Sequence, residues 1–248
     1  MLDCFAERRK SVMEAMGQGV LVVFAARPTF RNNDVEHEYR QDSDFFYLTG
    51  LDEPCCALVL SAELEQPFVL FVRPRDPERE TWDGERIGVD GALSRYGAHA
   101  AFPFDELNAQ LKELLKGKSR LYYAIGRDAQ NDEQVLRTLA FLRERGRRGD
   151  TGPVEIVEPS TVLHERRLIK REEEVESLRR AIEITRLGHH ELFARTHPKT
   201  TENQLEGILR ECFRTHGSER CAYPPIVASG RNARVLHHRR NDRVIGDG

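Results

Sequence analysis

Two pairs of adjacent histidines are the first residues of this sequence to consider for chemistry, namely His189 with His190 and His237 with His238. The first pair lies in a helical pattern, where neighbouring side chains point about 100° apart, so both imidazoles cannot easily reach one metal ion. His189 falls on the apolar stripe of this helix, and we expect it to be a packed histidine. The second pair lies in an expected strand, where neighbours face opposite sides, so only one of the two can point into a given site.

Local signatures of common catalytic sites do not occur in the sequence, which has no HExxH, GxSxG, P-loop or GxGxxG pattern. The basic residues around the second histidine pair could bind an anion, but a solvated strand edge is the favoured interpretation. They are Arg231, Arg234, Arg239, Arg240 and Arg243. Acidic and basic side chains are mixed over residues 31–44, which favours a polar surface loop over a cation site. Trp82 is expected in a polar loop, either as a contact residue or as part of the core.

The composition excludes several functional classes. The chain has 248 residues and a net charge of −3, so no global attraction to nucleic acid or anionic membranes is expected. No apolar run approaches the ~20 residues that span a bilayer, and the N-terminus lacks the apolar region of a signal peptide. The five cysteines are odd in number and form no CxxC pattern, which fits free thiols in a reducing compartment. We therefore expect a cytoplasmic protein that binds neither nucleic acid nor membrane.

Strands and helices are expected to alternate over the first 160 residues, which predicts a layered α/β domain. Helical spacing of leucines is seen at 104–116 and 135–142. Short apolar runs predict strands at 20–25, 45–48, 57–60, 68–72, 120–124 and 154–157. Cys55 and Cys56 are expected to begin the third of these strands as buried residues. A polar loop is expected at 145–150.

The last third of the chain begins with the longest predicted helix. Three glutamates at 172–174 suit the positive end of its dipole, and Pro198 ends it. Its apolar stripe comprises Val175, Leu178, Ile182, Thr185, His189 and Leu192. A second helix follows, stopped by Gly217, and then two short strands are expected at 223–230 and 234–238.

Five segments, in order, resemble the aminopeptidase P family. Residues 34–50 are similar to the N-terminal signature of the family. Within them, residues 39–50 follow its pattern Y-R-Q-x-S-x-F-x-Y-x-T-G. The segment 73–76 resembles its R-x-R-D, and 80–88 resembles the W-x-G-x-R-x-G that follows. Residues 167–185 resemble the first helix of the family's C-terminal domain. Residues 222–237 resemble the strand that delivers its first active-site histidine.

This resemblance implies a creatinase-like N-terminal domain over 1–168, with a mixed sheet flanked by helices. An incomplete α+β pita-bread peptidase domain would follow over 169–248. The implied reaction is the hydrolytic release of an N-terminal residue that precedes proline. The implied partners are peptides with proline at the second position and, in a homo-oligomer, further copies of the chain.

The resemblance also assigns roles to four residues. His237 matches the family histidine near the scissile bond, where it would donate a hydrogen bond to the substrate or to the developing tetrahedral intermediate. Asp34 and Trp82 match positions near the active-site entrance, where the N-terminal domain of one subunit approaches a neighbour's site. Tyr223 lies in the matching pocket strand.

The metal ligands of the family have no match in this sequence. In the family two divalent ions, typically manganese, are held by two Asp, one His and two Glu. Asp242 and Asp247 are the carboxylates that follow His237, and neither matches a ligand. We expect no metal bound by this chain.

Two hypotheses stay open: an inactive fragment of a metal-dependent aminopeptidase, or a non-catalytic pseudo-peptidase module for oligomerisation or peptide binding. Uncovered apolar surface is expected over 171–248, with self-association or partial disorder as its consequence.

Overall fold

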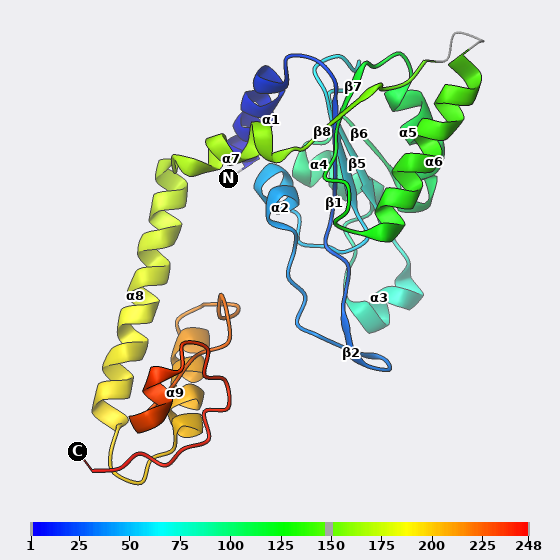
Figure 1. Ribbon diagram of the computed structural model, residues 1–248. Helices are drawn as coiled ribbons and strands as arrows, with labels where there is room; N and C mark the ends of the chain where they lie inside the picture. The colour runs from blue at the N-terminus through cyan, green and yellow to red at the C-terminus, as the bar shows by residue number, and fades with distance from the viewer. Residues whose placement is uncertain (1, 147–150, 248) are drawn as a thin grey trace. The chain divides into compact units, whose positions relative to one another are not determined.

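The computed structural model of the protein describes residues 2–146 and 151–247, and the chain folds as two units (Figure 1). The first unit is Met1–Ile169 and the second is Lys170–Gly248. The polar loop expected at 145–150 falls mainly on 147–150, outside the described residues.

A mixed six-stranded sheet forms the centre of the first unit, in the order β6-β5-β4-β1-β7-β8. The inner strands β1, β4 and β5 are paired antiparallel, whereas the β5–β6, β1–β7 and β7–β8 pairs are parallel. The strands are β1 (Val20–Phe24), β4 (Ala57–Leu60), β5 (Phe68–Val72), β6 (Ala100–Pro103), β7 (Arg120–Tyr122) and β8 (Glu155–Val157). The α/β fold class predicted from the sequence, with a mixed sheet flanked by helices, is confirmed.

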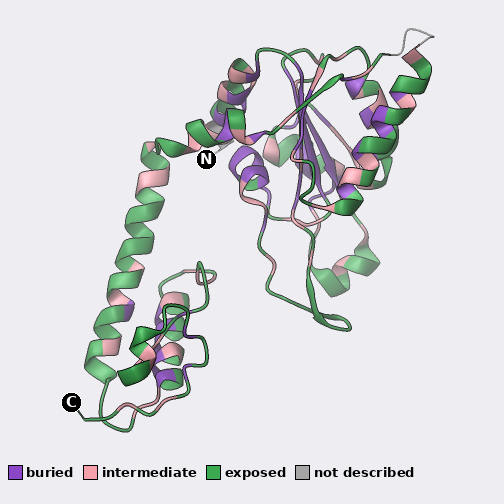
Figure 2. Cartoon of the chain, in the orientation of Figure 1, coloured by how far each residue is buried: buried purple, intermediate pink, exposed green. Residues whose placement is uncertain are grey.

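Helices cover both faces of this sheet, so its central strands are buried on both sides and read as continuous apolar runs. One face packs against α1 (Leu2–Met16), α2 (Ser43–Thr49), α4 (Gly88–Tyr96) and α7 (Ser160–Leu168). The other face packs against α5 (Leu107–Leu115), which follows the 3-10 turn η1 (Phe104–Glu106), and against α6 (Ala129–Arg145). The buried strands appear as the purple centre of Figure 2.

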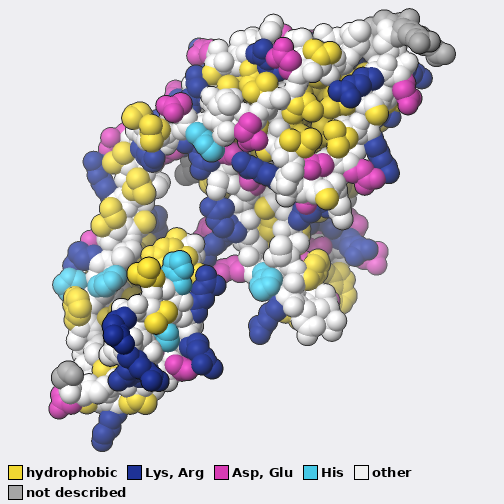
Figure 3. Space-filling model, in the orientation of Figure 1, with side chains coloured by type: hydrophobic (Ala, Val, Ile, Leu, Met, Phe, Trp, Pro, Cys, Tyr) yellow, Lys and Arg dark blue, Asp and Glu magenta, His cyan; other side chains and the backbone are white. Residues whose placement is uncertain are grey.

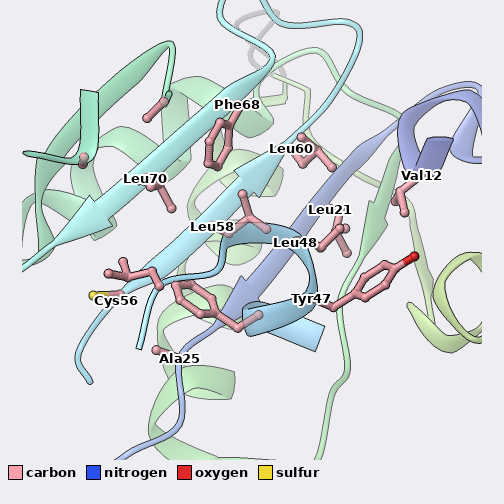
Figure 4. Close-up of a cluster of buried hydrophobic side chains, with 14 of the residues drawn as sticks. Val12, Leu21, Ala25, Tyr47, Leu48, Cys56, Leu58, Leu60, Phe68 and Leu70 are labelled. Carbon is pink, nitrogen blue, oxygen red and sulfur yellow. The ribbon is translucent and has the colours of Figure 1, made fainter. Parts of the chain in front are cut away.

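Alternation along each strand divides the core into two clusters. Leu58 and Leu70 point to the side of α1 and α2, where Figure 4 shows them with Leu48. Their neighbours Val59 and Val69 join the cluster under α5 and α6. Successive side chains of a strand face opposite sides, so a single register serves both layers.

The strand predicted at 45–48 is wrong, because these residues form α2. Asp42 caps the helix, with its Oδ1 accepting hydrogen bonds of 2.9 Å from the backbone N–H groups of Asp44 and Phe45. Gly50 ends it at φ 69°, with its N–H bound to the carbonyl of Phe46. The aromatic run favoured a strand, but the two caps and burial of one helical face outweigh that preference.

The strand expected to begin at Cys55 starts two residues later, at Ala57. Cys55 is exposed and has a positive φ of 54°, whereas Cys56 is buried. The positive φ marks a turn into the strand, so only one of the two thiols joins the core.

A hairpin and a short helix project from one end of the sheet (Figure 1). The hairpin joins β2 (Phe30–Asn32) to β3 (Val35–Glu36), and α3 is Pro77–Asp83. Trp82 therefore lies in a helix rather than in the predicted loop. Asp76 caps that helix by accepting a hydrogen bond from Arg79 N–H. Trp82 is 84% exposed, so it is not part of the core, which was one of the two positions expected for it.

The second unit is built from α8 (Glu172–Arg195), α9 (Glu202–Thr215) and the 3-10 turn η3 (Gly230–Arg234). The two helices pack closely at Gly188, the one buried residue among the described positions of α8. The described part of the chain contains no helix with the length and apolar character needed to cross a membrane.

The apolar stripe of α8 is largely solvent-exposed, which corrects the prediction of a packed His189 (Figure 2). Ile182 is 66% exposed, and His189 is exposed with its Nδ1 2.8 Å from the carbonyl oxygen of Thr185. The reason is geometric: α9 covers only the side of α8 that carries Gly188, and within the described part of this unit the stripe is left open.

Candidate functional site

His237 and His238 lie in a turn that follows η3, not in a strand. The N–H of His238 donates to the carbonyl of Val235 at 3.3 Å, which closes the turn. The side chain of His238 is buried, at 9% exposure, whereas that of His237 is exposed and forms no hydrogen bond within the described residues. Of this pair, His238 enters the interior and His237 is free to meet a ligand.

The two strands predicted at 223–230 and 234–238 are absent from the described residues. Pro224 and Pro225 have no N–H for a ladder, and side chains bind the backbone instead. Asn241 Oδ1 accepts from Val227 N–H at 3.2 Å, and Asn241 Nδ2 donates to the carbonyl of Pro225 at 3.1 Å. The five arginines expected at a strand edge accordingly lie in η3 and in the loop that follows it.

Glu202 organises this loop from the first turn of α9. The helix begins with a capping box in which Thr201 Oγ1 accepts from Gln204 N–H and the Gln204 side chain accepts from Thr201 N–H. Glu202 follows the Thr201 cap as the first residue of α9, and it is 0% exposed. Its Oε1 accepts from Ser229 N–H at 2.6 Å, from Ser229 Oγ at 2.8 Å and from Asn232 Nδ2 at 3.2 Å.

The second carboxylate oxygen is occupied as well. Oε2 accepts from Arg243 N–H and Asn232 Nδ2, both at 3.2 Å, and lies 3.0 Å from His238 Nε2. Burial alone would raise the pKa of Glu202, but the hydrogen bonds from Ser229, His238 and Arg243 lower it to about 2. The carboxylate is therefore ionised throughout the physiological pH range.

The carboxylate of Glu202 determines which ring nitrogen of His238 carries a proton. Its Nε2 also lies 3.2 Å from the backbone nitrogen of Asn241, whose N–H needs a lone pair as acceptor. One nitrogen cannot donate to Glu202 and accept from Asn241 at the same time. The charge-assisted bond to the ionised carboxylate is the stronger, so Nε2 carries a proton directed at Glu202.

Asn241 provides a second anchor to the same helix. It is buried, has a positive φ of 46°, which asparagine tolerates better than most residues, and donates from Nδ2 to Glu206 Oε2 at 2.7 Å. Burial acts to raise the pKa of Glu206, but the hydrogen bonds from Asn241 and Arg210 outweigh it and lower that pKa. Two glutamates one helical turn apart on α9 thus hold the C-terminal loop.

The described residues do not fit a two-metal centre. Among them, Glu202, His238 and Asp242 are the one group of three or more His, Cys, Asp or Glu residues whose ligand atoms lie within 4.8 Å of one another. Both oxygens of Glu202 already accept from N–H and O–H donors, and exposed Asp242 is paired with Arg240 at 3.6 Å. Two divalent ions need several carboxylates that are free to bind and bridge them.

The other predicted site residues are exposed and divided between the units. Asp34 lies in the β2–β3 turn and Trp82 in α3, both in the first unit. Tyr223 is 70% exposed and lies with His237 on the segment after α9, in the second unit. Figure 3 shows hydrophobic, histidine and basic side chains gathered on one face of that unit.

Sequence reasoning missed Glu202 and Asn241, although the Thr201–Gln204 capping box marked the helix start where Glu202 lies.

Two family comparisons account for most of the chain. Residues 5–123 match the aminopeptidase P N-terminal domain, and residues 176–248 match metallopeptidase family M24. The first match lies within the first unit and the second match within the second unit, so each unit is similar to one of these two families. The first matched region contains Asp34 and Trp82, and the second contains Glu202, Tyr223 and His237.

Relatives resemble the chain over nearly its whole length. The Xaa-Pro aminopeptidase of Escherichia coli is 39% identical over 247 residues, which are 98% of this chain and 56% of the relative. Human Xaa-Pro aminopeptidase 3 is 30% identical over 98% of this chain and 50% of its own length. Aminopeptidase PepP of Pseudomonas aeruginosa is 41% identical, with a TM-score of 0.97 over 100% of this chain and 57% of that structure. The chain spans between 50% and 57% of the length of these proteins.

Proposed function

We propose that this chain is the N-terminal part of a metal-dependent Xaa-Pro aminopeptidase, which releases an N-terminal residue that precedes proline. The supporting observation is similarity to Xaa-Pro aminopeptidases that runs through both units, with 98% of the chain aligned at 39% identity to the Escherichia coli protein. The proposed substrates are peptides with proline at the second position.

His237 is the residue proposed to contact the reacting bond. Its exposed imidazole forms no hydrogen bond within the described part of the chain, so it is available to donate to the carbonyl oxygen as negative charge develops there. Tyr223 is proposed to contact the proline ring, because a prolyl amide has no N–H to recognise and an aromatic face suits the ring. Asp34 and Trp82 are proposed to lie near the entrance of a neighbouring subunit's site in a homo-oligomer.

The whole protein is proposed to use two divalent ions, by analogy with the family manganese. Such ions would activate water and polarise the scissile carbonyl. The described residues offer no fitting ligand set, so the 248-residue chain is proposed to be inactive on its own. A cytoplasmic location is proposed because Cys55, Cys56, Cys212 and Cys221 are free thiols, which suits a reducing compartment.

A second candidate is a non-catalytic module for oligomerisation or peptide binding. The observation that favours it is the poor fit of the described residues to a metal centre, together with the exposed apolar stripe of α8. In this alternative the site residues bind peptides without cleaving them.

A paired assay separates the two candidates. The 248-residue chain and the product of the complete reading frame are each incubated with manganese and an Xaa-Pro peptide, with a matched Xaa-Ala peptide as control, and bound metal is measured by mass spectrometry. The proposal expects turnover of the Xaa-Pro peptide and about two ions in the complete product, and neither in the chain. The module would be favoured if the complete product binds the peptide but binds no metal and does not cleave the peptide.

A further inference from the structure

The loop 229–243 is closed at its base by a single side chain. Its first residue, Ser229, and its last, Arg243, both donate a backbone N–H to Glu202, one to each carboxylate oxygen. The backbone N–H of Glu202 itself donates to the carbonyl of Arg243 at 2.9 Å. Bringing the ends of a flexible loop together costs conformational entropy, and here one buried carboxylate offsets that cost.

The same carboxylate holds the turn that carries His237. His238, the next residue, is buried with its Nε2 3.0 Å from Glu202 Oε2, and Asn232 in η3 donates to both oxygens. Since the backbone on both sides of His237 is tied to Glu202, the direction of the His237 imidazole depends on a group that it does not touch.

We propose that Glu202 is a positioning residue for His237, acting by holding Ser229, Asn232, His238 and Arg243 on one ionised carboxylate. The inference rests on the proposed function for its catalytic consequence, but its structural part stands on this chain alone. A metal ion bound between His238 and Glu202 is not favoured. The N–H groups of Ser229, Asn232 and Arg243 already donate hydrogen bonds to the carboxylate oxygens that such an ion would need.

The first test uses Glu202→Gln in the 248-residue chain. The amide keeps the size of the side chain but places an NH₂ group against N–H donors, so at least one end of the loop loses its acceptor. We expect the amide of Ser229, of Arg243 or of both to exchange hydrogen at least about 10-fold faster, with α8 and α9 unchanged. The matched control is Glu211→Gln, which removes an exposed carboxylate of α9 that pairs with Arg195 and should leave the loop as it is.

A second measurement needs no variant. Nitrogen-15 spectra of the wild-type chain report which ring nitrogen of His238 is protonated, and the inference requires a proton on Nε2. Asn232→Ala, a milder change that removes one donor to Glu202, should give a smaller acceleration of exchange in the same loop. Unchanged exchange in Glu202→Gln, or a His238 protonated on Nδ1 alone at neutral pH, would overturn the inference. If Glu202→Gln instead unfolds the unit, the Asn232→Ala exchange decides in the same way.

The catalytic consequence is tested in the complete reading-frame product. Glu202→Gln should lower kcat for an Xaa-Pro peptide by about 100-fold, as expected for a misplaced reacting group, with a smaller change in KM. A change in KM alone would contradict positioning of a group that acts in the transition state. Absence of turnover in the wild-type product would remove the proposed function, whereas the exchange and nitrogen-15 results would still decide whether Glu202 holds the loop.

Discussion

The Cα of Gly188 faces the ring of Phe213 so closely that a Cβ atom there would lie 2.6 Å from the ring carbon Cε1. The same Cβ would lie 3.1 Å from Leu209 Cδ2. The helices α8 and α9 therefore pack closely at Gly188, with no room for a methyl group.

Gly188→Ala should therefore destabilise the second unit, although alanine favours helices by up to about 1 kcal/mol. Overpacking costs about 1–3 kcal/mol, so after the gain in helix propensity the net loss should be up to roughly 2 kcal/mol in urea unfolding. Gly207→Ala is the matched control, since nothing lies within 4 Å of its Cβ position in α9 and the variant should be slightly more stable. Equal effects of the two variants would show that the helices do not pack at Gly188.

Asp42→Ala should destabilise the first unit by about 1 kcal/mol, because it removes the cap of the buried helix α2. Asp76→Ala removes a similar cap from α3, none of whose described residues is buried, so that helix should fray without changing global stability. Thermal unfolding followed by circular dichroism separates the two. Equal shifts in Tm would be inconsistent with the burial of α2.

The second unit should lose stability in acid through Glu202. In the folded unit the pKa of this carboxyl is lowered from 4.5 to about 2, so the unfolded chain takes up a proton first as the pH falls. The contribution of Glu202 is fully present above about pH 5 and is lost between roughly pH 5 and pH 2. Hydrogen exchange of residues 225–244 over this window should show it, and Glu202→Gln should flatten the pH dependence. A loop equally protected at pH 2.5 and pH 6 would contradict the lowered pKa.

The exposed stripe of α8 should promote self-association of the chain. Leu178 and Ile182 expose large apolar side chains on adjacent turns, and burying them between two copies would remove that surface from water. The double change Leu178→Gln and Ile182→Gln should lower the sedimentation coefficient at high protein concentration. Leu136→Gln, on the exposed side of α6, is the control and should have no effect. A chain that is monomeric before any substitution would exclude this interface.

His237→Gln in the complete reading-frame product should lower kcat for Xaa-Pro peptides by about 100-fold or more and change KM little. A hydrogen bond made to developing charge acts in the transition state rather than on the bound substrate. His189→Gln, an exposed histidine on α8, is the control. A variant with altered KM and normal kcat would assign His237 to peptide binding instead.

Local patterns in the sequence predicted much of the first unit. The runs at 20–25, 57–60 and 68–72 became β1, β4 and β5, because strands buried on both faces must be apolar at every position. The pattern failed at 45–48, where aromatic residues suit a strand as well as a helix. The capping residues Asp42 and Gly50, on either side of this run, are the sequence signals that favour a helix there.

The candidate site was predicted only in part. The residue types and order of motifs named His237 as the functional histidine, and the tertiary structure showed that its neighbour His238 is the one directed inward. Local periodicity could not show this, since the bond that holds His238 comes from Glu202, 36 positions earlier in the chain. Periodicity reports which face of an element meets apolar surroundings; it does not report which distant polar group will meet a buried side chain. The type of each element and the apolar core follow from neighbouring residues, whereas the closed loop and the exposed imidazole depend on hydrogen bonds that exist only after α9 and the C-terminal segment have packed together.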